Sequence, residues 1–284
     1  MIQPEEFQRG LSQHGYGFQY AVLSKISELI AARKARPRLL DGVEVPVSLG
    51  GLETRVDIIY KASSVSHSEY LVIECKRVNP AYSAWCFAKS PRPYPEYSES
   101  QIALESIRDA GPNCVGVEVR GGQFSNRCYH VSWSMRSNNR DGDLHPVSED
   151  RDAIERACGQ VCLGSSGLAW SLIQRDYLGQ NPSISAFTLV PVIVTTANLY
   201  VTNSNLFETT LSTGDLELSE EDLEERPWII YQYMLSPSRV IQSYREYERT
   251  NNVVDNLAGD SIRSVAIVTA GGLESFLRWY DGII

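Results

Sequence analysis

Three charged side chains, Asp57, Glu74 and Lys76, have the types and spacing that metal-assisted hydrolysis requires. Glu74 and Lys76 end the apolar run 70–77 (Tyr-Leu-Val-Ile-Glu-Cys-Lys-Arg) and are separated by one residue. Because side chains alternate between the two faces of a strand, Glu74 and Lys76 are expected on the same face. Carboxylates suit hard divalent cations, and a neighbouring ammonium can orient a water and stabilise developing negative charge.

A second apolar run brings Asp57 into the same region. Residues 54–60 (Thr-Arg-Val-Asp-Ile-Ile-Tyr) are typical of a strand, and the polar, serine-rich residues 61–69 are typical of a hairpin loop. All three charges interrupt apolar strands, where burial is costly without a partner or a metal. The hairpin therefore predicts a site for a divalent cation and the water that it activates. The alternative is a surface Glu–Lys pair beside an unrelated exposed Asp57.

The order Asp…Glu-x-Lys resembles the PD-(D/E)XK nuclease superfamily, although Val56 stands where the family's proline precedes the aspartate. The resemblance implies that Asp57 and Glu74 ligate Mg²⁺ or Mn²⁺, with the backbone carbonyl of Cys75 as a further ligand. It also implies that Lys76 orients or deprotonates the attacking water. The Cys75 thiol is expected to pack in the core on the opposite face of the strand.

Members of the superfamily often place a glutamate on the preceding helix to complete the metal site. Residues 15–33 are predicted to form that helix, because apolar side chains recur there at helical spacing. Glu28 lies nearly opposite the apolar stripe, whereas Gln19 lies within the inward arc. Gln19 is therefore the candidate catalytic residue at this position, with a neutral amide in place of the acid. The alternative is a polar residue beside a core helix.

The resemblance implies an α/β, restriction-endonuclease-like fold, in which helices flank a mixed central sheet built in the order αβββαβ. The strand-like run 43–49 and the Gly50-Gly51 turn precede the Asp57 strand and supply the first hairpin. One elaborated domain is expected over residues 1–284, with a core of about 13–77 and 150–203, a large insertion at 78–149 and a C-terminal extension at 204–284.

The crossover helix and the fourth core strand are expected at 150–162 and 187–196, with Gly164 to Gly167 interrupting the helix. An alternative gives these two roles to a helix at 99–110 and a strand at 114–120. The C-terminal extension is expected to add two strands and a closing helix to the sheet, at 228–233, 264–269 and 273–280.

Basic and aromatic side chains follow the Lys76 strand immediately. Phosphate contacts and base stacking use such residues, so substrate binding is expected at Lys89, Arg92, Trp85 and Tyr94. The alternative is that this proline-rich arm packs on its own core or on a second subunit.

The net charge of −9 lies entirely in the second part of the chain. Residues 1–110 carry 13 basic and 13 acidic side chains, whereas residues 111–284 carry 13 and 22. A local basic lining is enough for a nucleic-acid partner, because charge contacts are short-range at physiological salt. No Cys-x-x-Cys pair occurs among the six cysteines, so reduced thiols are expected, with Cys158 and Cys162 in buried packing.

These features predict a metal-dependent endonuclease in restriction, repair or defence, acting on DNA in preference to RNA. No apolar run reaches the roughly 20 residues of a membrane span and no signal-peptide pattern opens the chain, so a cytoplasmic protein without a membrane partner is expected. A homodimer would allow two sites to cut both strands. The alternative from a different class is a catalytically inactive nuclease-fold protein that binds or scaffolds, which Gln19 and the acidic second half favour.

Overall fold

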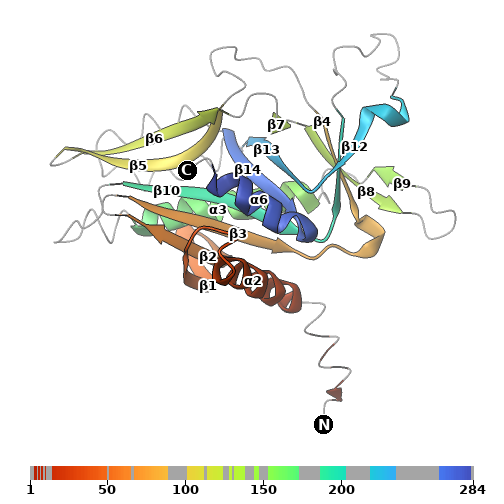
Figure 1. Cartoon of the computed structure of the whole chain (residues 1–284), viewed down its shortest axis with the longest axis horizontal. Helices are drawn as coiled ribbons and strands as arrows, with labels where there is room; N and C mark the ends of the chain where they lie inside the picture. Colours follow the sequence, from red (N-terminus) through yellow and green to blue (C-terminus); the bar gives the residue numbers. More distant parts are fainter. Residues whose placement is uncertain are drawn as a thin grey trace.

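Two mixed β-sheets form the framework of the protein (Figure 1). The computed structural model describes residues 15–49, 51–64, 67–88, 101–111, 114–123, 128–129, 131–137, 144–146, 153–172, 186–202, 218–234 and 262–282, together with positions 3, 4, 6, 8 and 10. The α-helices described are α2 (Tyr16–Ala31), α3 (Ala153–Leu172) and α6 (Leu273–Asp281). Short 3₁₀ turns are η1 (Pro80–Tyr82), η5 (Glu220–Asp222) and η6 (Ala270–Gly272).

The larger sheet has nine strands, with the path β1-β2-β3-β10-β14-β13-β7 and the hairpin β5-β6 attached to β10. Its strands are β1 (Leu39–Leu49), β2 (Leu52–Ser63), β3 (Ser68–Lys76), β5 (Gln101–Gly111), β6 (Cys114–Gln123), β7 (Cys128–Tyr129), β10 (Ala186–Thr195), β13 (Trp228–Met234) and β14 (Ile262–Thr269). The smaller sheet has the order β12-β11-β4-β8-β9, with β4 (Ala84–Ala88), β8 (Val131–Ser137), β9 (Leu144–Pro146), β11 (Asn198–Thr202) and β12 (Leu223–Arg226).

The first three strands form an antiparallel meander, as the alternating apolar runs predict. Gly51, in the turn between β1 and β2, has φ +76°, a conformation that glycine adopts without steric cost. Beyond β3, α3 leads to β10, which runs parallel to β3 and directly beside it. Such a parallel neighbour requires a crossover connection, and the predicted helix and strand at 150–162 and 187–196 overlap α3 and β10.

Helices cover both faces of the larger sheet. Figure 1 shows α2 and α6 in front of the sheet and α3 behind it. The front cluster joins apolar side chains of these two helices to inward residues of the strands, among them Ile26, Leu29, Phe276, Ile58, Leu71 and Val194. The rear cluster joins α3 and the smaller sheet to the opposite strand faces, among them Ile154, Val161, Trp85, Leu199, Val72 and Ile193.

The helix predicted at 99–110 is a strand instead, because β5 spans Gln101–Gly111. This segment contains alanine, leucine and glutamate, which favour helices. In the folded chain it pairs along its length with β6 and, through residues 105–108, with β10. Tertiary pairing therefore overrides the local propensity, and this segment does not supply the crossover helix.

The predicted break at Gly164 to Gly167 is also wrong, since α3 continues through Leu172. A Cβ on Gly164 would lie 2.9 Å from Val56 Cγ2, and one on Gly167 would lie 3.0 Å from Val47 Cβ. These glycines therefore permit close packing of the helix on β1 and β2 rather than ending it.

The C-terminal strands and helix agree with the prediction. β13 and β14 pair antiparallel, β14 lies parallel to β10, and α6 packs on the same sheet. Pro191 lies within β10, between residues 186–189, which pair with β5, and residues 192–195, which pair with β14. Pro191 has no backbone N–H to donate, and it lies where the neighbour of β10 on the side away from β3 changes from β5 to β14.

Candidate functional site

Asp57 and Glu74 lie where the β2–β3 ladder ends. Its last pair is Ile58 with Ile73, so the two acids occupy the next opposed positions. The Cys75 backbone N–H donates to Asp57 Oδ2 at 2.7 Å. This charge-assisted bond fixes the orientation of the Asp57 carboxylate against β3.

Lys76 connects β3 to α3. Its Nζ lies 2.7 Å from Glu74 Oε1 and donates to Gln160 Oε1 at 2.6 Å. Glu74 and Lys76 thus share the face of the strand that α3 covers, as the strand period predicts. Cys75 packs against the cluster of α2 and α6 on the other face, and burial raises the pKa of its thiol.

Burial dominates the electrostatics of the two acids. Glu74 is only 4% exposed, and burial raises its pKa to about 7, with Lys76 opposing the rise and the charge of Asp57 adding to it. Burial also raises the pKa of Asp57, against the hydrogen bond from Cys75 and the charge of Lys76. A bound cation would therefore stabilise the ionised form of both carboxylates, because it offsets the cost of burying their charge.

Gln19 reaches Asp57 through the main chain. It is buried on α2, and its Nε2 donates to the Asp57 backbone oxygen at 2.9 Å. Because α2 and α3 cover opposite faces of the sheet, the Gln19 amide approaches from the side away from Lys76. The observed contact holds the backbone that carries the Asp57 carboxylate.

Glu44 on β1 is a third acid near the pair, which the sequence did not single out. Val43 pairs with Ile58 and Val45 with Val56, so Glu44 lies opposite Asp57. Its φ of +53° is unusual for a residue other than glycine. Its charge contributes to the raised pKa values of Asp57 and Glu74. A glutamate between two valines is typical of an ordinary solvent-facing strand position, so sequence alone gave no signal.

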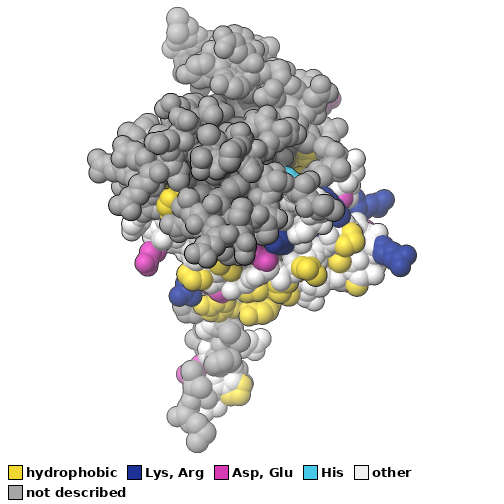
Figure 2. Space-filling model, turned by 90° about the vertical axis from the view of Figure 1, so that its left-hand side faces the viewer, with side chains coloured by type: hydrophobic (Ala, Val, Ile, Leu, Met, Phe, Trp, Pro, Cys, Tyr) yellow, Lys and Arg dark blue, Asp and Glu magenta, His cyan; other side chains and the backbone are white. Residues whose placement is uncertain are grey.

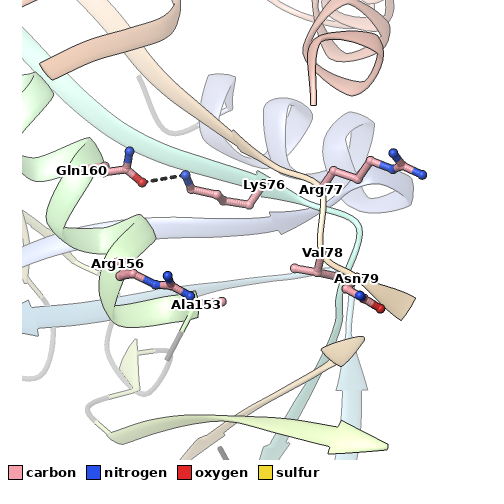
Figure 3. Close-up of a pocket in the computed structure, with 7 residues that line it drawn as sticks. All are labelled: Lys76, Arg77, Val78, Asn79, Ala153, Arg156 and Gln160. Carbon is pink, nitrogen blue, oxygen red and sulfur yellow. Dashed lines mark hydrogen bonds between the residues drawn. The ribbon is translucent and has the colours of Figure 1, made fainter. Parts of the chain in front are cut away.

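A pocket of about 590 Å³ opens between the end of β3 and α3 (Figure 3). Two of its helix residues, Arg156 and Gln160, were not expected from the sequence, because polar residues four apart on a helix usually mark a solvated face. The described residues that line it are Lys76, Arg77, Val78, Asn79, Ala153, Arg156 and Gln160.

The expected substrate-binding residues divide into two groups. Trp85 lies in β4 and is fully buried in the rear cluster, which corrects the expectation that it stacks on a base. That cluster contains side chains of α3 and of both sheets, so the alternative of an arm packed on its own core fits this residue. Lys89, Arg92 and Tyr94 lie outside the described residues.

The donor chemistry of this region suits a hard cation. Asp57, Glu74 and the Cys75 carbonyl offer oxygen atoms only, and Mg²⁺ is commonly held by one or two carboxylates with several waters. Within the described ranges, no group of three or more His, Cys, Asp or Glu side chains is arranged to hold a metal. Cys158 and Cys162 are buried in the rear cluster, as predicted.

Exposed apolar side chains bear on the expected homodimer. On the outer strand β1, Leu39 and Leu40 are 76% and 48% exposed, and Tyr20 on α2 is 58% exposed. Figure 2 shows hydrophobic side chains gathered on the lower part of the described surface, with charged side chains beside them. Exposure of this kind leaves room for a partner without identifying one, so the homodimer stays a prediction.

No protein family, curated protein or solved structure matches this chain. Among the helices that the structure describes, none is both long enough and apolar enough to cross a membrane.

Proposed function

We propose that this protein is a metal-dependent nuclease that hydrolyses phosphodiester bonds, with DNA as its preferred substrate and a role in restriction, repair or defence. One observation carries the proposal. The carboxylates of Asp57 and Glu74 and the ammonium of Lys76 come together at one end of a buried hairpin, and Glu74 is 4% exposed. Burying such charges is expensive, and functional sites are where proteins commonly do so.

The arrangement of elements adds support. Helix α2, the antiparallel strands β1 to β3, the connection through α3 and the parallel strand β10 follow the order expected of a restriction-endonuclease-like core. The division into core, insertion and C-terminal extension remains part of the proposal.

Asp57, Glu74 and the Cys75 carbonyl would hold Mg²⁺ or Mn²⁺, which supplies Lewis acidity and lowers the pKa of bound water. Asp57 is oriented by the Cys75 N–H, and its backbone is held by Gln19. Lys76, held by Glu74 and Gln160, would orient the attacking water and stabilise the charge that develops on the phosphate.

A second candidate is a nuclease-fold protein without catalysis that binds nucleic acid or serves as a scaffold. The specific observation in its favour is that the charges already have partners within the chain. Glu74 pairs with Lys76, and Asp57 accepts from the Cys75 N–H.

A cleavage assay separates the two candidates. The protein is incubated with single- and double-stranded DNA and RNA in Mg²⁺, in Mn²⁺ and in EDTA, beside Lys76→Ala and the control Lys25→Ala. Lys25 is an exposed lysine on α2. We expect metal-dependent cleavage that Lys76→Ala reduces by about 100-fold or more and that Lys25→Ala leaves unchanged. Equal cleavage by wild type and Lys76→Ala would refute the assigned site, and no cleavage of any substrate would favour the binding candidate.

A further inference from the structure

The polar side chains described in the lining of the pocket between β3 and α3 present mainly hydrogen-bond donors. Gln160 Oε1 accepts from Lys76 Nζ at 2.6 Å. An ammonium can only donate, so this contact requires the oxygen of Gln160 to face Lys76 and leaves its NH₂ group for other partners. The Asn79 side chain behaves in the same way, because its Oδ1 accepts from the Ala81 N–H at 3.0 Å. In both amides the oxygen is already engaged within the chain, and the NH₂ group remains as a donor.

The charged side chains that line the pocket are also hydrogen-bond donors. Lys76, Arg77 and Arg156 line the pocket, and none of its described lining residues is acidic. The Lys76 ammonium has three donors, of which Glu74 and Gln160 take two. Figure 3 shows Arg156 one helical turn from Gln160, on the side of α3 that faces Lys76, whereas the Arg77 side chain points away. Among the described lining cations, Lys76 and Arg156 extend into the space between β3 and α3.

The wall opposite α3 is anchored to the sheet. The Lys76 carbonyl accepts from the Thr196 N–H at 3.1 Å, and the Val78 N–H donates to Thr196 Oγ1 at 3.0 Å. Residues 76–79 are thus tied to the end of β10, and Asn79 is tied to the following 3₁₀ turn. These bonds fix the backbone of this wall before any ligand arrives, which lowers the entropic cost of binding.

We propose that this pocket binds a phosphate group of the nucleic-acid substrate, beside the one that is cleaved. The inference rests on the proposed function and deepens it. A phosphate presents acceptors only, so it matches a lining of ammonium, guanidinium and amide donors. A volume of about 590 Å³ also leaves room for the attached nucleotide, whose apolar parts meet Val78 and Ala153. The phosphate is either the terminal group of a strand or an internal diester.

Metal-free binding tests the pocket without cleavage. Fluorescent single-stranded oligonucleotides with a 5′-phosphate, a 3′-phosphate or no terminal phosphate are titrated in EDTA and followed by anisotropy. The variants are Arg156→Gln, which removes a cation, and Gln160→Glu, which keeps an oxygen for Lys76 but replaces the donor with a carboxylate. Both residues are exposed, so the core stays intact. Arg278→Gln on α6, an exposed arginine across the sheet, is the charge-matched control.

We expect each pocket variant to weaken binding about tenfold or more, since hydrogen bonds to charged groups are among the stronger ones. For Arg156→Gln the salt dependence, as the slope of log K against log salt, should fall by about 0.7. Loss confined to the phosphate-ended oligonucleotides identifies a terminal phosphate, and equal loss for all three identifies an internal diester. Wild type that binds none of them, or pocket variants that behave like Arg278→Gln, would overturn the proposal.

Cleavage by the same variants separates this inference from the proposed function. If Lys76→Ala abolishes cleavage while both pocket variants bind and cleave like wild type, the pocket assignment is wrong and the nuclease stands. If wild type cleaves nothing but its binding depends on Arg156 and Gln160, the pocket stands and the nuclease assignment fails.

Discussion

Replacing Glu74 by glutamine is expected to stabilise the metal-free protein at pH 8. Burial raises the pKa of Glu74 from its ordinary 4.5 to about 7, although Lys76 opposes the rise. Glutamine keeps the shape of the side chain and an oxygen that can accept from Lys76, but it carries no charge. The variant therefore resembles wild type with Glu74 protonated, which is the form that the buried site favours.

The sign and size of this effect follow from the shift in pKa. A carboxyl with a higher pKa in the folded state holds its proton more tightly there, so its contribution to stability falls as the pH rises. The loss begins near the unfolded value of 4.5 and is complete above about 7. A pKa difference of two to three units at roughly 1.36 kcal/mol per pKa unit corresponds to about 3 kcal/mol. Since an amide only approximates a protonated acid, we expect a gain of about 2–3 kcal/mol at pH 8.

Urea denaturation between pH 5 and pH 8 in EDTA measures this gain. Glu53→Gln, which removes an exposed carboxylate of β2, is the matched control. The free energy of unfolding of Glu74→Gln relative to wild type should rise by about 2–3 kcal/mol across this range, and that of the control should stay nearly constant. A difference that does not change with pH, or a Glu74→Gln protein that is less stable than wild type at pH 8, would refute the reasoning.

Repeating the measurement with MgCl₂ connects stability to the proposed function. A cation that binds only the folded protein stabilises it by mass action. Wild type at pH 8 should therefore gain stability with Mg²⁺, and Glu74→Gln should gain less. Equal gains in the two proteins would mean that the cation binds elsewhere.

Substitutions at two buried residues, Arg38 and Trp85, test the core. Arg38→Met should lower the free energy of unfolding in urea by about 3–5 kcal/mol, because the buried Glu69 and the partly buried Asp281 lose a paired guanidinium. Lys34→Met, at an exposed pair, should cost less than about 1 kcal/mol. Similar losses in both variants would contradict this expectation. Trp85→Ala should lower the free energy of unfolding by about 3–5 kcal/mol, because it removes a fully buried ring. The milder Trp85→Phe should leave the affinity for nucleic acid unchanged in an anisotropy assay. Weaker binding by Trp85→Phe would mean that Trp85 does contact the substrate.

Strand periodicity alone determined the local part of the site. In residues 70–77 the alternation of apolar and charged positions places Glu74 and Lys76 on one face and Cys75 on the other, and the contacts of all three agree. The helix at 16–31 and the C-terminal strands were likewise predictable, because each buries a stripe or face that its own periodicity defines.

Tertiary structure decided whatever depends on distant partners. Gln160 meets Lys76 across 84 positions of sequence, and Glu44 lies opposite Asp57 only because of the β1–β2 register. Residues 101–111 favour a helix locally but gain more by pairing with β6 and β10. Gly164 and Gly167 resemble a helix break in the sequence, yet they let α3 approach the sheet.

The proposed site likewise combines features that are local in the sequence with features that depend on distant partners. Sequence sufficed to identify the hairpin of Asp57, Glu74 and Lys76, because residue type and strand period are local properties. It could not reveal that Gln19 binds the Asp57 backbone from one face while Arg156 and Gln160 approach Lys76 from the other. Which face of a sheet a helix covers is set by packing between elements, and that information is spread over the whole chain.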